Sequence, residues 1–547
     1  MAKKNILLIE PGYPNKYPPL GLMKIAAYHG PLGRGDTVCF VKGEKPEILA
    51  NAWDRVYVTT LFSFEWKRTS AAIDFALRAV RGQAERVFVG GIAATLMFDE
   101  FVREPRWAGV RFAKGLLDRA PALSLQLSAE DGDFGSEDFL GTPIEELVPD
   151  YSILQHTRYR YPVRDAYFGY ASRGCVRKCS FCGVPKLEGP QREVPPITSL
   201  VSGVDKQFGP KKDLILMDNN VVASARYTEV VAEIRDLGFH RGAVFERQGS
   251  PSVKRRVDFN QGVDARILVK TPMYLREMAT ICIDPLRIAF DHVGMRRVYE
   301  RSVQMAADYG LASLSNYMLY NFMDAPADLY ERMRINIELN ERLGVRIWSF
   351  PMRYLPVTMK DRSHVGKNWN RYYLRSFQIM LQATHGVVTG NGQFFDRAFG
   401  SSYDEFERLL ALPHAFIFQR DYYENGPGKP VLDEYHSLLR RLTPLQRTEL
   451  IQLLSATIFA RPRRDAFLRL VSDESINPLL RELARYHSLV TGASNVTDIA
   501  EVLPELTPGS MLPEPDALVE DAGLYEPLDE PPANLMHSKS SAPTPLR

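Results

Sequence analysis

The sequence has almost no net charge, no long apolar run and few cysteines. Its 68 Lys and Arg residues balance 66 Asp and Glu residues to a formal charge of +2, which gives no bulk attraction to nucleic acid or to an anionic membrane. No apolar run approaches the roughly 18 residues that indicate a transmembrane helix. Near the N-terminus, the short run Asn5–Ile9 is followed by Glu10-Pro11-Gly12, which predicts a strand and not a signal peptide. We expect a cytoplasmic protein with no membrane partner and no clear nucleic-acid signal.

The length of the chain sets the expected number of domains. A chain of 547 residues is too long for one ordinary domain, so two or three are expected. Apolar residues make up 45% of the sequence, which is enough for large cores.

Three of the five cysteines lie within eight residues. Cys175, Cys179 and Cys182 have the spacing C-x3-C-x2-C, and a short loop with this spacing can point three thiolates at one centre. Iron–sulfur clusters are held by such thiolates, normally four of them. Since the fourth local ligand is missing, one iron would stay open for a substrate or cofactor, as an open metal position marks a catalytic site.

A structural zinc site is the first alternative. It usually needs four Cys or His ligands, but the nearest histidines on either side of the loop are His156 and His240. The spacing also differs from the paired C-x2-C motifs of zinc sites, and a chain without an export signal disfavours disulfides. A protein of another class stays open: a non-catalytic binding protein that an iron–sulfur cluster or zinc stabilises.

The loop Arg173–Gly183, with the sequence RGCVRKCSFCG, resembles the signature of the radical S-adenosylmethionine (radical SAM) superfamily. In that family the three cysteines bind a [4Fe–4S] cluster, and SAM chelates the fourth iron through its amino and carboxylate groups. The resemblance implies that Phe181 lies near the adenine and that Ala166–Ser172 is a strand that delivers the loop. It also implies a one-electron reductant, such as flavodoxin or ferredoxin, as a partner.

Residues 1–125 alternate strand and helix signals. This order predicts a doubly wound, Rossmann-like parallel sheet, whose ligands lie beyond the carboxyl ends of the strands. The expected strands are Asn5–Ile9, Thr37–Val41, Arg55–Thr59 and Arg86–Val89, and the expected helices are Leu20–Tyr28 and Thr69–Val80.

This order resembles the cobalamin-binding domain that precedes the barrel in one large radical SAM subgroup. The matching segments are Pro18-Pro19-Leu20-Gly21-Leu22 and Val89-Gly90-Gly91-Ile92. The resemblance implies cobalamin as a further cofactor, with Gly90 and Gly91 in its site. The D-x-H-x-x-G motif, whose histidine ligates cobalt in some relatives, is absent. A scaffold without a cofactor is therefore the alternative, since paired glycines also make tight turns.

Residues 126–165 are expected to be a linker, because residues 129–138 are acidic and turn-rich without periodicity. Strand–helix alternation resumes over residues 166–357. With the strand that delivers the loop, the strands there make six units, consistent with the partial (β/α)6 barrel of radical SAM enzymes, in which the carboxyl ends of the strands carry the chemistry. The expected strands after the loop are Asp213–Met217, Val257–Asn260, Leu286–Phe290, Tyr317–Phe322 and Arg346–Phe350.

Polar residues at these strand ends are the cofactor-site candidates. The resemblance places Asp218-Asn219-Asn220 where a Gly-Gly-Glu motif holds the methionine amine, and a carboxylate and amides can accept from an ammonium. It assigns Arg266 to the methionine carboxylate, since Arg suits planar carboxylates. Asn316–Phe322, which includes Asn321, stands where a glycine-containing segment usually supports the adenine. Arg353 would face the substrate or brace the barrel rim, and structural ion pairs are the alternative for the charged residues.

Residues 358–500 change to helical periodicity and predict a helical domain, within which His385 and Asn391-Gly392 are candidates to close over the barrel mouth. The last 47 residues contain nine prolines and no sustained periodicity, so a disordered tail is expected over 501–547. The expected helices are Arg371–Ala383, Tyr403–Leu412, Val431–Leu442 and Thr448–Phe459.

The sequence therefore predicts an α/β protein with an N-terminal Rossmann-like domain, a central partial (β/α)6 radical SAM barrel and a C-terminal helical domain. The expected function is reductive cleavage of SAM by a [4Fe–4S] cluster and hydrogen abstraction from an unidentified small-molecule or peptide substrate. Cobalamin-dependent methyl transfer or rearrangement is a further outcome. A methylthiotransferase is disfavoured, because outside the loop only Cys39 and Cys282 remain, too few for a second cluster.

Overall fold

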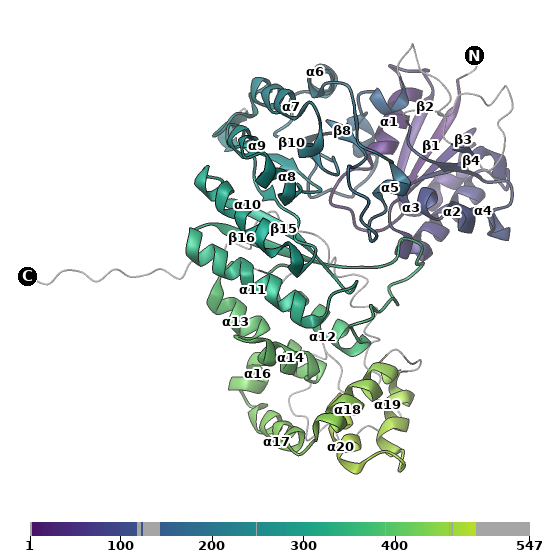
Figure 1. Ribbon diagram of the computed structural model, residues 1–547. Coiled ribbons are helices and arrows are strands. Elements are labelled where there is room, and N and C mark those ends of the chain that lie inside the picture. Colours follow the sequence, from purple (N-terminus) through teal and green to yellow (C-terminus); the bar gives the residue numbers. More distant parts are fainter. Residues whose placement is uncertain are drawn as a thin grey trace, which may run out of the picture. The chain divides into compact units, whose positions relative to one another are not determined.

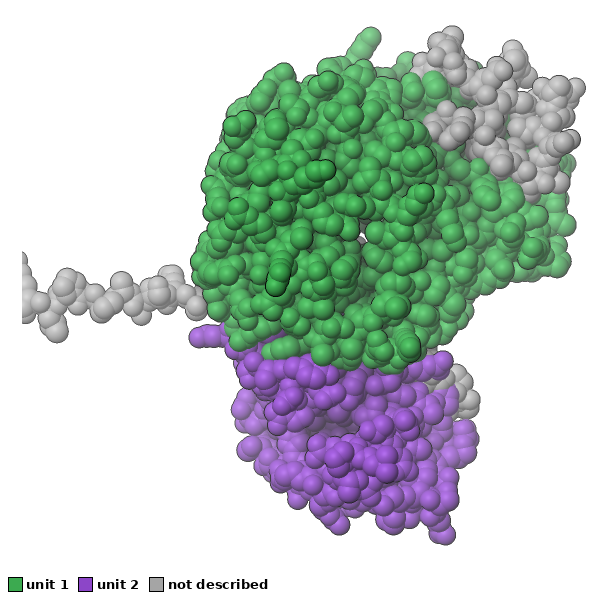
Figure 2. All heavy atoms as spheres, in the orientation of Figure 1, with its two compact units in different colours: residues 1–369, 390–392 green, residues 370–389, 393–547 purple. Residues whose placement is uncertain are grey.

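The structure is a computed structural model, and its chain forms two compact units. Unit 1 contains residues 1–369 and 390–392, and unit 2 contains residues 370–389 and 393–547 (Figure 2). No helix among the described residues is long and apolar enough to cross a membrane. The stretch 129–138, His385 and the tail 501–547 lie outside the described residues. The described residues are 3–117, 122–123, 143–247, 249–384, 386–388, 390–458, 460 and 463–487.

Unit 1 begins with a six-stranded sheet in the order β2-β1-β3-β4-β5-β6 (Figure 1). Strands β1 to β5 pair in parallel, and β6 pairs antiparallel with β5. The expected strands and helices are confirmed within three residues at each end, whereas β5 and the short helices before it are additional. The strands are β1 Asn5–Glu10, β2 Thr37–Lys42, β3 Arg55–Thr60, β4 Val87–Gly91, β5 Arg111–Lys114 and β6 Ala122–Leu123, and the helices are α1 Leu20–His29, α2 Trp66–Ala79, α3 Ile92–Leu96 and α4 Phe98–Val102.

Both faces of this N-terminal sheet are buried. Ile6 and Leu8 of β1 belong to a core that includes α1 and continues into the second part of unit 1. Leu7 and Ile9 point to the opposite face and pack in the core of α2. A strand whose alternate side chains are all apolar is typical of a parallel sheet covered on both faces. Because one core runs through both parts, the N-terminal sheet is packed directly on the rest of unit 1.

The second part of unit 1 contains six parallel strands in chain order, in two sheets of three. Single parallel bridges, Val257–Ile283 and Val263–Ile288, join the two sheets. Arg287 strengthens this junction, since it donates to Asp258 at 2.7 Å and to Ser315 at 3.2 Å. The strands are β7 Ala166–Gly169, β10 Asp213–Leu216, β13 Val257–Phe259, β14 Leu286–Arg287, β15 Ser313–Tyr320 and β16 Arg346–Arg353.

Helices connect consecutive strands of this second set, so all six carboxyl ends lie at one edge. An antiparallel hairpin of β11 and β12, which the sequence analysis missed, precedes β13. The helices are α5 Val184–Leu187, α6 Ile197–Phe208, α7 Tyr227–Ile234, α8 Ala265–Lys270, α9 Met273–Met278, α10 Arg296–Asp308 and α11 Pro326–Leu343, and the hairpin strands are β11 Val244–Arg247 and β12 Ser250–Lys254.

Several expected strand boundaries in this region are wrong. The strand expected over Ala166–Ser172 ends at Gly169, because the next amides bond to the side chain of Asp218 and not to a neighbouring strand. The strand expected at Leu286–Phe290 is regular only over two residues. β15 starts at Ser313 and ends before Asn321, whose φ of 67° breaks the extended backbone. β16 continues to Arg353 because Arg353 still pairs with Tyr320.

Unit 2 is helical, as expected, but has more helices than the four predicted. α13, between the first two predicted helices, is additional, and Gly392 of the predicted Asn391-Gly392 pair is its first residue. Buried His487 lies between the hydroxyl groups of Tyr372 and Tyr435, at 2.6 and 3.0 Å. The helices are α12 Arg371–Ala383, α13 Gly392–Phe399, α14 Tyr403–Ala411, α15 His414–Phe418, α16 Arg420–Asn425, α17 Lys429–Arg440, α18 Pro444–Thr457, α19 Arg463–Ser472 and α20 Pro478–His487.

Candidate functional site

A two-stranded ribbon closes the base of the cysteine loop. β8 (Ser172–Arg173) pairs antiparallel with β9 (Arg192–Glu193), so the chain leaves and returns at one point. Gly174, directly after β8, has a φ of 77°, and a Cβ there would lie 2.1 Å from the carbonyl oxygen of Pro190. Only glycine fits this position, because a side chain would meet rigid backbone.

The three cysteines of this loop are half-buried and form no disulfide. The amide of Arg177 donates to Sγ of Cys175 at 3.3 Å, and the amide of Val184 donates to Sγ of Cys182 at 3.4 Å. A turn brings the amide of Cys182 to the carbonyl oxygen of Cys179 at 3.1 Å. Amide donors stabilise the charged form of a thiol, which is the form that binds metals.

Burial raises the pKa of Cys182, and the other two thiols raise it further. Burial also raises the pKa of Cys179, to which Asp291 adds while Arg266 opposes it. These mutual effects show that the thiols lie within electrostatic range of one another. Neutral thiols release protons when a metal binds, so these cysteines would lose their protons on loading.

Among the described residues, no three His, Cys, Asp or Glu side chains lie close enough to hold one metal ion. A single zinc ion therefore has no ready-made set of ligands here. Each thiolate of a multi-iron cluster binds a different iron, so cluster ligands lie farther apart than the ligands of one ion. The donor set, three thiols of which two accept from backbone amides, fits an iron–sulfur cluster. The remaining cysteines are elsewhere: Cys39 lies in β2, and Cys282 precedes β14.

Buried charges fix the base of the loop. Arg173 donates to Glu145 at 2.8 Å and to Glu188 at 3.0 Å, and its guanidinium lies 3.6 Å from the ring centre of Tyr170. Lys24 of α1 pairs with the same Glu145 at 3.1 Å. The loop is thereby tied to the N-terminal sheet through a network that is almost entirely buried.

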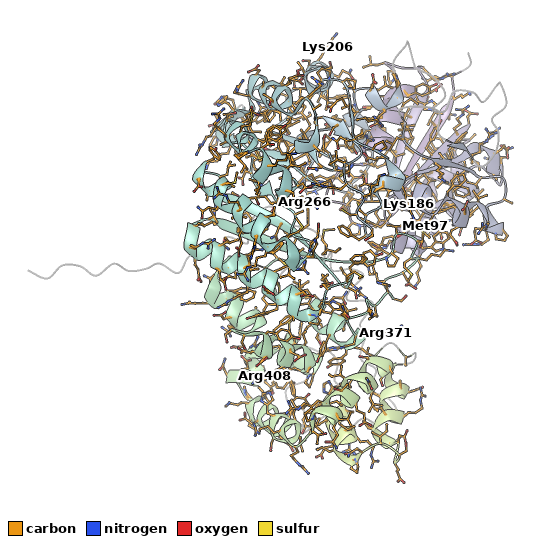
Figure 3. The ribbon with its side chains drawn as sticks, viewed as in Figure 1. Met97, Lys186, Lys206, Arg266, Arg371 and Arg408 are labelled. Carbon is orange, nitrogen blue, oxygen red and sulfur yellow. The ribbon has the colours of Figure 1, made fainter. Side chains whose placement is uncertain are left out.

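A second charged group lies at the ends of the neighbouring strands. Arg177 of the cysteine loop donates to Asp264 at 2.7 Å. Arg266 donates to both oxygens of Asp264, at 2.8 and 3.0 Å. The structure thus places Arg266 beside the loop, where the carboxylate-binding role predicts it, but with two of its donors already engaged. Figure 3 shows Arg266 in the central part of unit 1, with Lys186 of α5 toward the N-terminal sheet.

The predicted amine site, Asp218-Asn219-Asn220, also lies beside the loop, and its polar groups have partners within the chain. The buried Asp218 carboxylate accepts from the amides of Ala171 at 2.9 Å and Ser172 at 2.5 Å, and from the Ser172 hydroxyl at 2.7 Å. Burial raises the pKa of Asp218 to about 6. Asn219 donates to Glu188 at 3.0 Å, and Asn220 accepts from the Asp264 amide at 3.3 Å.

Phe181 joins the cysteine loop to the ends of β15 and β16. Its ring packs edge-on against Phe322 at 5.7 Å between ring centres, and Phe322 packs against Tyr354 at 4.7 Å. This aromatic group gives an apolar surface next to the third cysteine.

Asn321 and Arg353 hold the segment that follows β16. The buried amide of Asn321 donates to the carbonyl oxygen of Tyr354 at 3.0 Å and accepts from the Gly366 amide at 2.7 Å. Arg353 donates to the carbonyl oxygens of Arg362 at 3.0 Å and His364 at 2.8 Å. Of the two roles considered for Arg353, these contacts match a brace at the rim.

Gly90 and Gly91 lie at the carboxyl end of β4. Gly91 has a φ of 105°, and a Cβ there would lie 2.4 Å from the carbonyl oxygen of Thr60, so strand packing alone accounts for this glycine. A Cβ at Gly90 would meet only the Cβ of Ala113, at 3.7 Å. In α3, which follows, Leu96 would lie 3.1 Å from a Cβ on Gly183. The edge that carries the two glycines therefore reaches the cysteine loop.

Two further residues lie at this edge: Asp291, one of the polar strand-end residues that the sequence analysis considered for a site or a structural ion pair, and Arg332, which it did not consider. Asp291 follows β14, and its charge acts on Cys179, Cys182 and Arg266. The fully buried Arg332 of α11 donates to the carbonyl oxygens of Phe290 and Asp291, both at 3.1 Å. The position of Asp291 after an apolar strand was visible in the sequence, whereas its neighbours depend on the fold.

No model of a known protein family matches the chain, and no curated protein sequence matches it. Similar solved structures include two of the radical S-adenosylmethionine methyltransferase TsrM from Kitasatospora setae. The one with cobalamin and a [4Fe–4S] cluster bound is 14% identical, with 66% of this chain and 77% of that chain covered and a TM-score of 0.43. The one with tryptophan substrate and the SAM analogue aza-SAM bound is 14% identical, with 65% and 75% covered and a TM-score of 0.40. Because the sequence identities and TM-scores are this low, the function of the chain is inferred from its own residues.

Proposed function

We propose that this protein is a radical SAM enzyme. The observation that carries the proposal is a loop of three free cysteines, two of which accept from backbone amides, at the carboxyl edge of six parallel strands. The other two cysteines lie outside this loop, so three thiolates would leave one iron of a cluster without a thiolate. Such an open position is where a small molecule binds a catalytic metal centre.

Different residues of the chain would bind the cluster and the parts of SAM. Cys175, Cys179 and Cys182 would hold the [4Fe–4S] cluster, and the ring of Phe181 offers an apolar surface for the adenine. Arg266 would bind the methionine carboxylate with the donor that Asp264 does not use. When bound, the cluster and SAM supply a one-electron cleavage that starts hydrogen abstraction. The buried network around Arg173 would keep the loop in place during this reaction.

The electron would come from a one-electron donor of the flavodoxin or ferredoxin type. The substrate would be a small molecule or a peptide that enters at the carboxyl edge of the strands. The space-filling view shows a hollow in the middle of unit 1 (Figure 2), which is the shape that a site for a small ligand needs.

A second candidate, methyl transfer with cobalamin, is favoured by the edge of the N-terminal sheet. Phe62, after β3, and Ile92, after β4, expose large apolar side chains there, which suit the face of a large ring. The His29 imidazole is engaged in the core by Asp36 at 2.7 Å and Tyr57 at 2.9 Å, so it is not free to ligate cobalt. A corrinoid would then be held without this histidine.

The experiment is anaerobic reconstitution followed by analysis for iron, sulfide, zinc and corrinoid. We expect about four iron and four sulfide ions per chain, and 5′-deoxyadenosine once the protein is reduced with SAM. Bound corrinoid would add methyl transfer to the proposal. Stoichiometric zinc without iron would overturn it in favour of the alternative, a non-catalytic binding protein stabilised by metal.

A further inference from the structure

A long segment without regular structure follows β16. Residues 354–370 connect β16 to α12 and contain turns but neither a helix nor a strand. Pro351 before this segment and Gly366 within it are buried, whereas every residue from 354 to 365 is at least partly exposed. Long connections of this kind are uncommon in compact domains and are usually functional. Residues 354–365 are called the strap below.

Buried groups hold the two ends of the strap together. The side chain of Asn321, which is fully buried, donates to the carbonyl oxygens of Tyr354 at 3.0 Å and His364 at 3.3 Å. It also accepts from the Gly366 amide at 2.7 Å. A Cβ on Gly366 would lie 2.6 Å from the carbonyl oxygen of Asn321, so the two backbones are in direct contact. The base of the strap is therefore firmly closed.

The tip of the strap reaches the N-terminal sheet through side chains that solvent can reach. Lys360 pairs with Glu100 of α4 at 3.0 Å, and these two side chains are 42% and 48% exposed. Arg362 lies 3.7 Å from Glu65, which follows β3. Ion pairs this exposed contribute little to stability, so the tip is held much more weakly than the base.

Aromatic rings add a second weak contact for the same two cations. The ammonium nitrogen of Lys360 lies 4.1 Å from the ring centre of Trp66, and the guanidinium of Arg362 lies 4.2 Å from that of Phe64. Cation–π contacts at exposed sites are also modest in strength. They fix where the tip rests without making it costly to lift.

The strap passes the cysteine loop on its way to the N-terminal sheet. A Cβ on Gly183, directly after the third cysteine, would lie 3.5 Å from Cγ1 of Val357. At the base, the ring of Tyr354 packs on Phe322, and Phe322 packs on Phe181 of the loop. The strap therefore runs from the carboxyl edge of the second strand set, past the third cysteine, to the edge of the N-terminal sheet.

We propose that the strap is a lid over the cysteine loop. Its tip lifts around the base that Asn321 holds, admits SAM and the substrate, and closes over them. The inference rests on the proposed function for the ligand, SAM, while the lid itself follows from contacts within the chain. Segments with few buried contacts open at the lowest free-energy cost, and such opening controls ligand exchange in many enzymes.

The first test needs neither the cluster nor SAM. Glu65→Ala with Glu100→Ala removes the carboxylates that hold the tip but keeps Lys360 and Arg362, after which trypsin can cleave. Because cleavage follows the population of the open form, the variant should be cut at these two sites about two- to tenfold faster. Cleavage after Lys367, which lies beyond the base, should be unchanged. Mass spectrometry of the fragments gives all three rates.

The second test measures SAM exchange by stopped flow with the reconstituted, oxygen-free protein. If SAM must pass the lid in both directions, its association and dissociation rates should rise by the same factor as the cleavage rate. The Kd, which is the ratio of these rates, should then stay within about twofold of the wild-type value. A role of the two glutamates in ligand binding would change the Kd instead.

Glu300→Ala with Glu331→Ala is the matched control. It also replaces two glutamates and breaks two exposed ion pairs, both with Arg296, but these lie away from the strap. Neither the cleavage rates in the strap nor the SAM rates should change in this variant.

The outcomes separate this inference from the proposed function. Unchanged cleavage in Glu65→Ala with Glu100→Ala, or equal acceleration after Lys367, would show that the tip does not lift and would overturn the lid alone. Faster cleavage with unchanged SAM rates, or a changed Kd, would also overturn it. A wild-type protein that loads no cluster or binds no SAM would overturn the proposed function and, with it, SAM as the ligand; the cleavage rates would still decide whether the tip lifts.

Discussion

The two sets of parallel strands in unit 1 are built alike, but their carboxyl edges differ. At the edge of the N-terminal sheet, buried Glu10 pairs with Lys42 at 2.9 Å and also accepts from Tyr161 and Asn15. The ring centre of Tyr159 lies 4.4 Å from the ammonium nitrogen of Lys42. Charges at this edge are therefore satisfied within the chain.

The edge of the second set is paired less completely. Its buried carboxylate, Asp218, is held by neutral donors, while Asp291 has no partner among the described residues. Three thiols add groups that can bind metal. The difference teaches that the buried charges of one edge are paired within the chain, whereas the other edge has a carboxylate without an ion pair among the described residues.

The largest expected difference between the edges comes from the cysteines. Cys175→Ala, Cys179→Ala and Cys182→Ala together should lower the iron content to background and abolish SAM cleavage, because no other thiol replaces them. Far-UV circular dichroism should be almost unchanged, since the three side chains are only half-buried. Cys39→Ala, in the N-terminal sheet, is the control and should keep its iron; a loss of iron there would break the comparison.

The next largest effect concerns the base of the loop. Arg173→Met should lower the free energy of unfolding by about 3–5 kcal/mol, because it leaves Glu145 and Glu188 buried with one partner fewer. Urea unfolding measures this value. Arg296→Met removes two solvent-exposed ion pairs, with Glu300 and Glu331, and should lower the free energy of unfolding by at most about 1 kcal/mol. Equal losses of unfolding free energy in Arg173→Met and Arg296→Met would contradict the conclusion that the buried ion pairs of Arg173 hold the loop.

A pH experiment compares the two buried carboxylates. The raised pKa of Asp218, about 6 against a usual 3.8, means that the folded protein holds this proton more tightly. The resulting stability is present below about pH 4 and is lost as the pH rises through about 6, a change of about 3 kcal/mol. Asp218→Asn should remove this dependence from the unfolding free energy.

Glu10→Gln is the counterpart at the other edge. It leaves Lys42 buried without its carboxylate and should cost about 3 kcal/mol at pH 7, whereas Asp218→Asn, which removes a buried charge but leaves one backbone amide without its acceptor, should cost about 1 kcal/mol there. If Glu10→Gln and Asp218→Asn lower the free energy of unfolding equally at pH 7, the two edges do not differ in how their buried carboxylates are paired.

The smallest expected effect separates the two glycines of β4. Gly91→Ala should cost about 2 kcal/mol, because its φ of 105° is strained for other residues and the Cβ would meet Thr60. Gly90→Ala should stay within about 0.5 kcal/mol, since its Cβ makes ordinary contacts. Thermal unfolding gives both values. A large cost at Gly90 would mean that this position also serves packing.

Local sequence patterns predicted most of the strands of unit 1 and the position of the cysteine loop. Apolar runs located β1 to β4 and the strands after the cysteine loop, and the spacing of Cys175, Cys179 and Cys182 located the loop. Contacts between distant segments were not predictable. The role of Asp218 depends on amides 46 and 47 residues away in the sequence, and nothing local marks Asp291 as unpaired. The domain boundaries and the roles of the site residues stay predictions.

The most direct test of the central claim is electron paramagnetic resonance of the reduced, reconstituted protein with and without SAM. An open iron predicts the spectrum of a reduced [4Fe–4S] cluster that changes when SAM is added. A protein that binds SAM but shows the same spectrum in both samples, or that shows no cluster signal at all, would contradict the account.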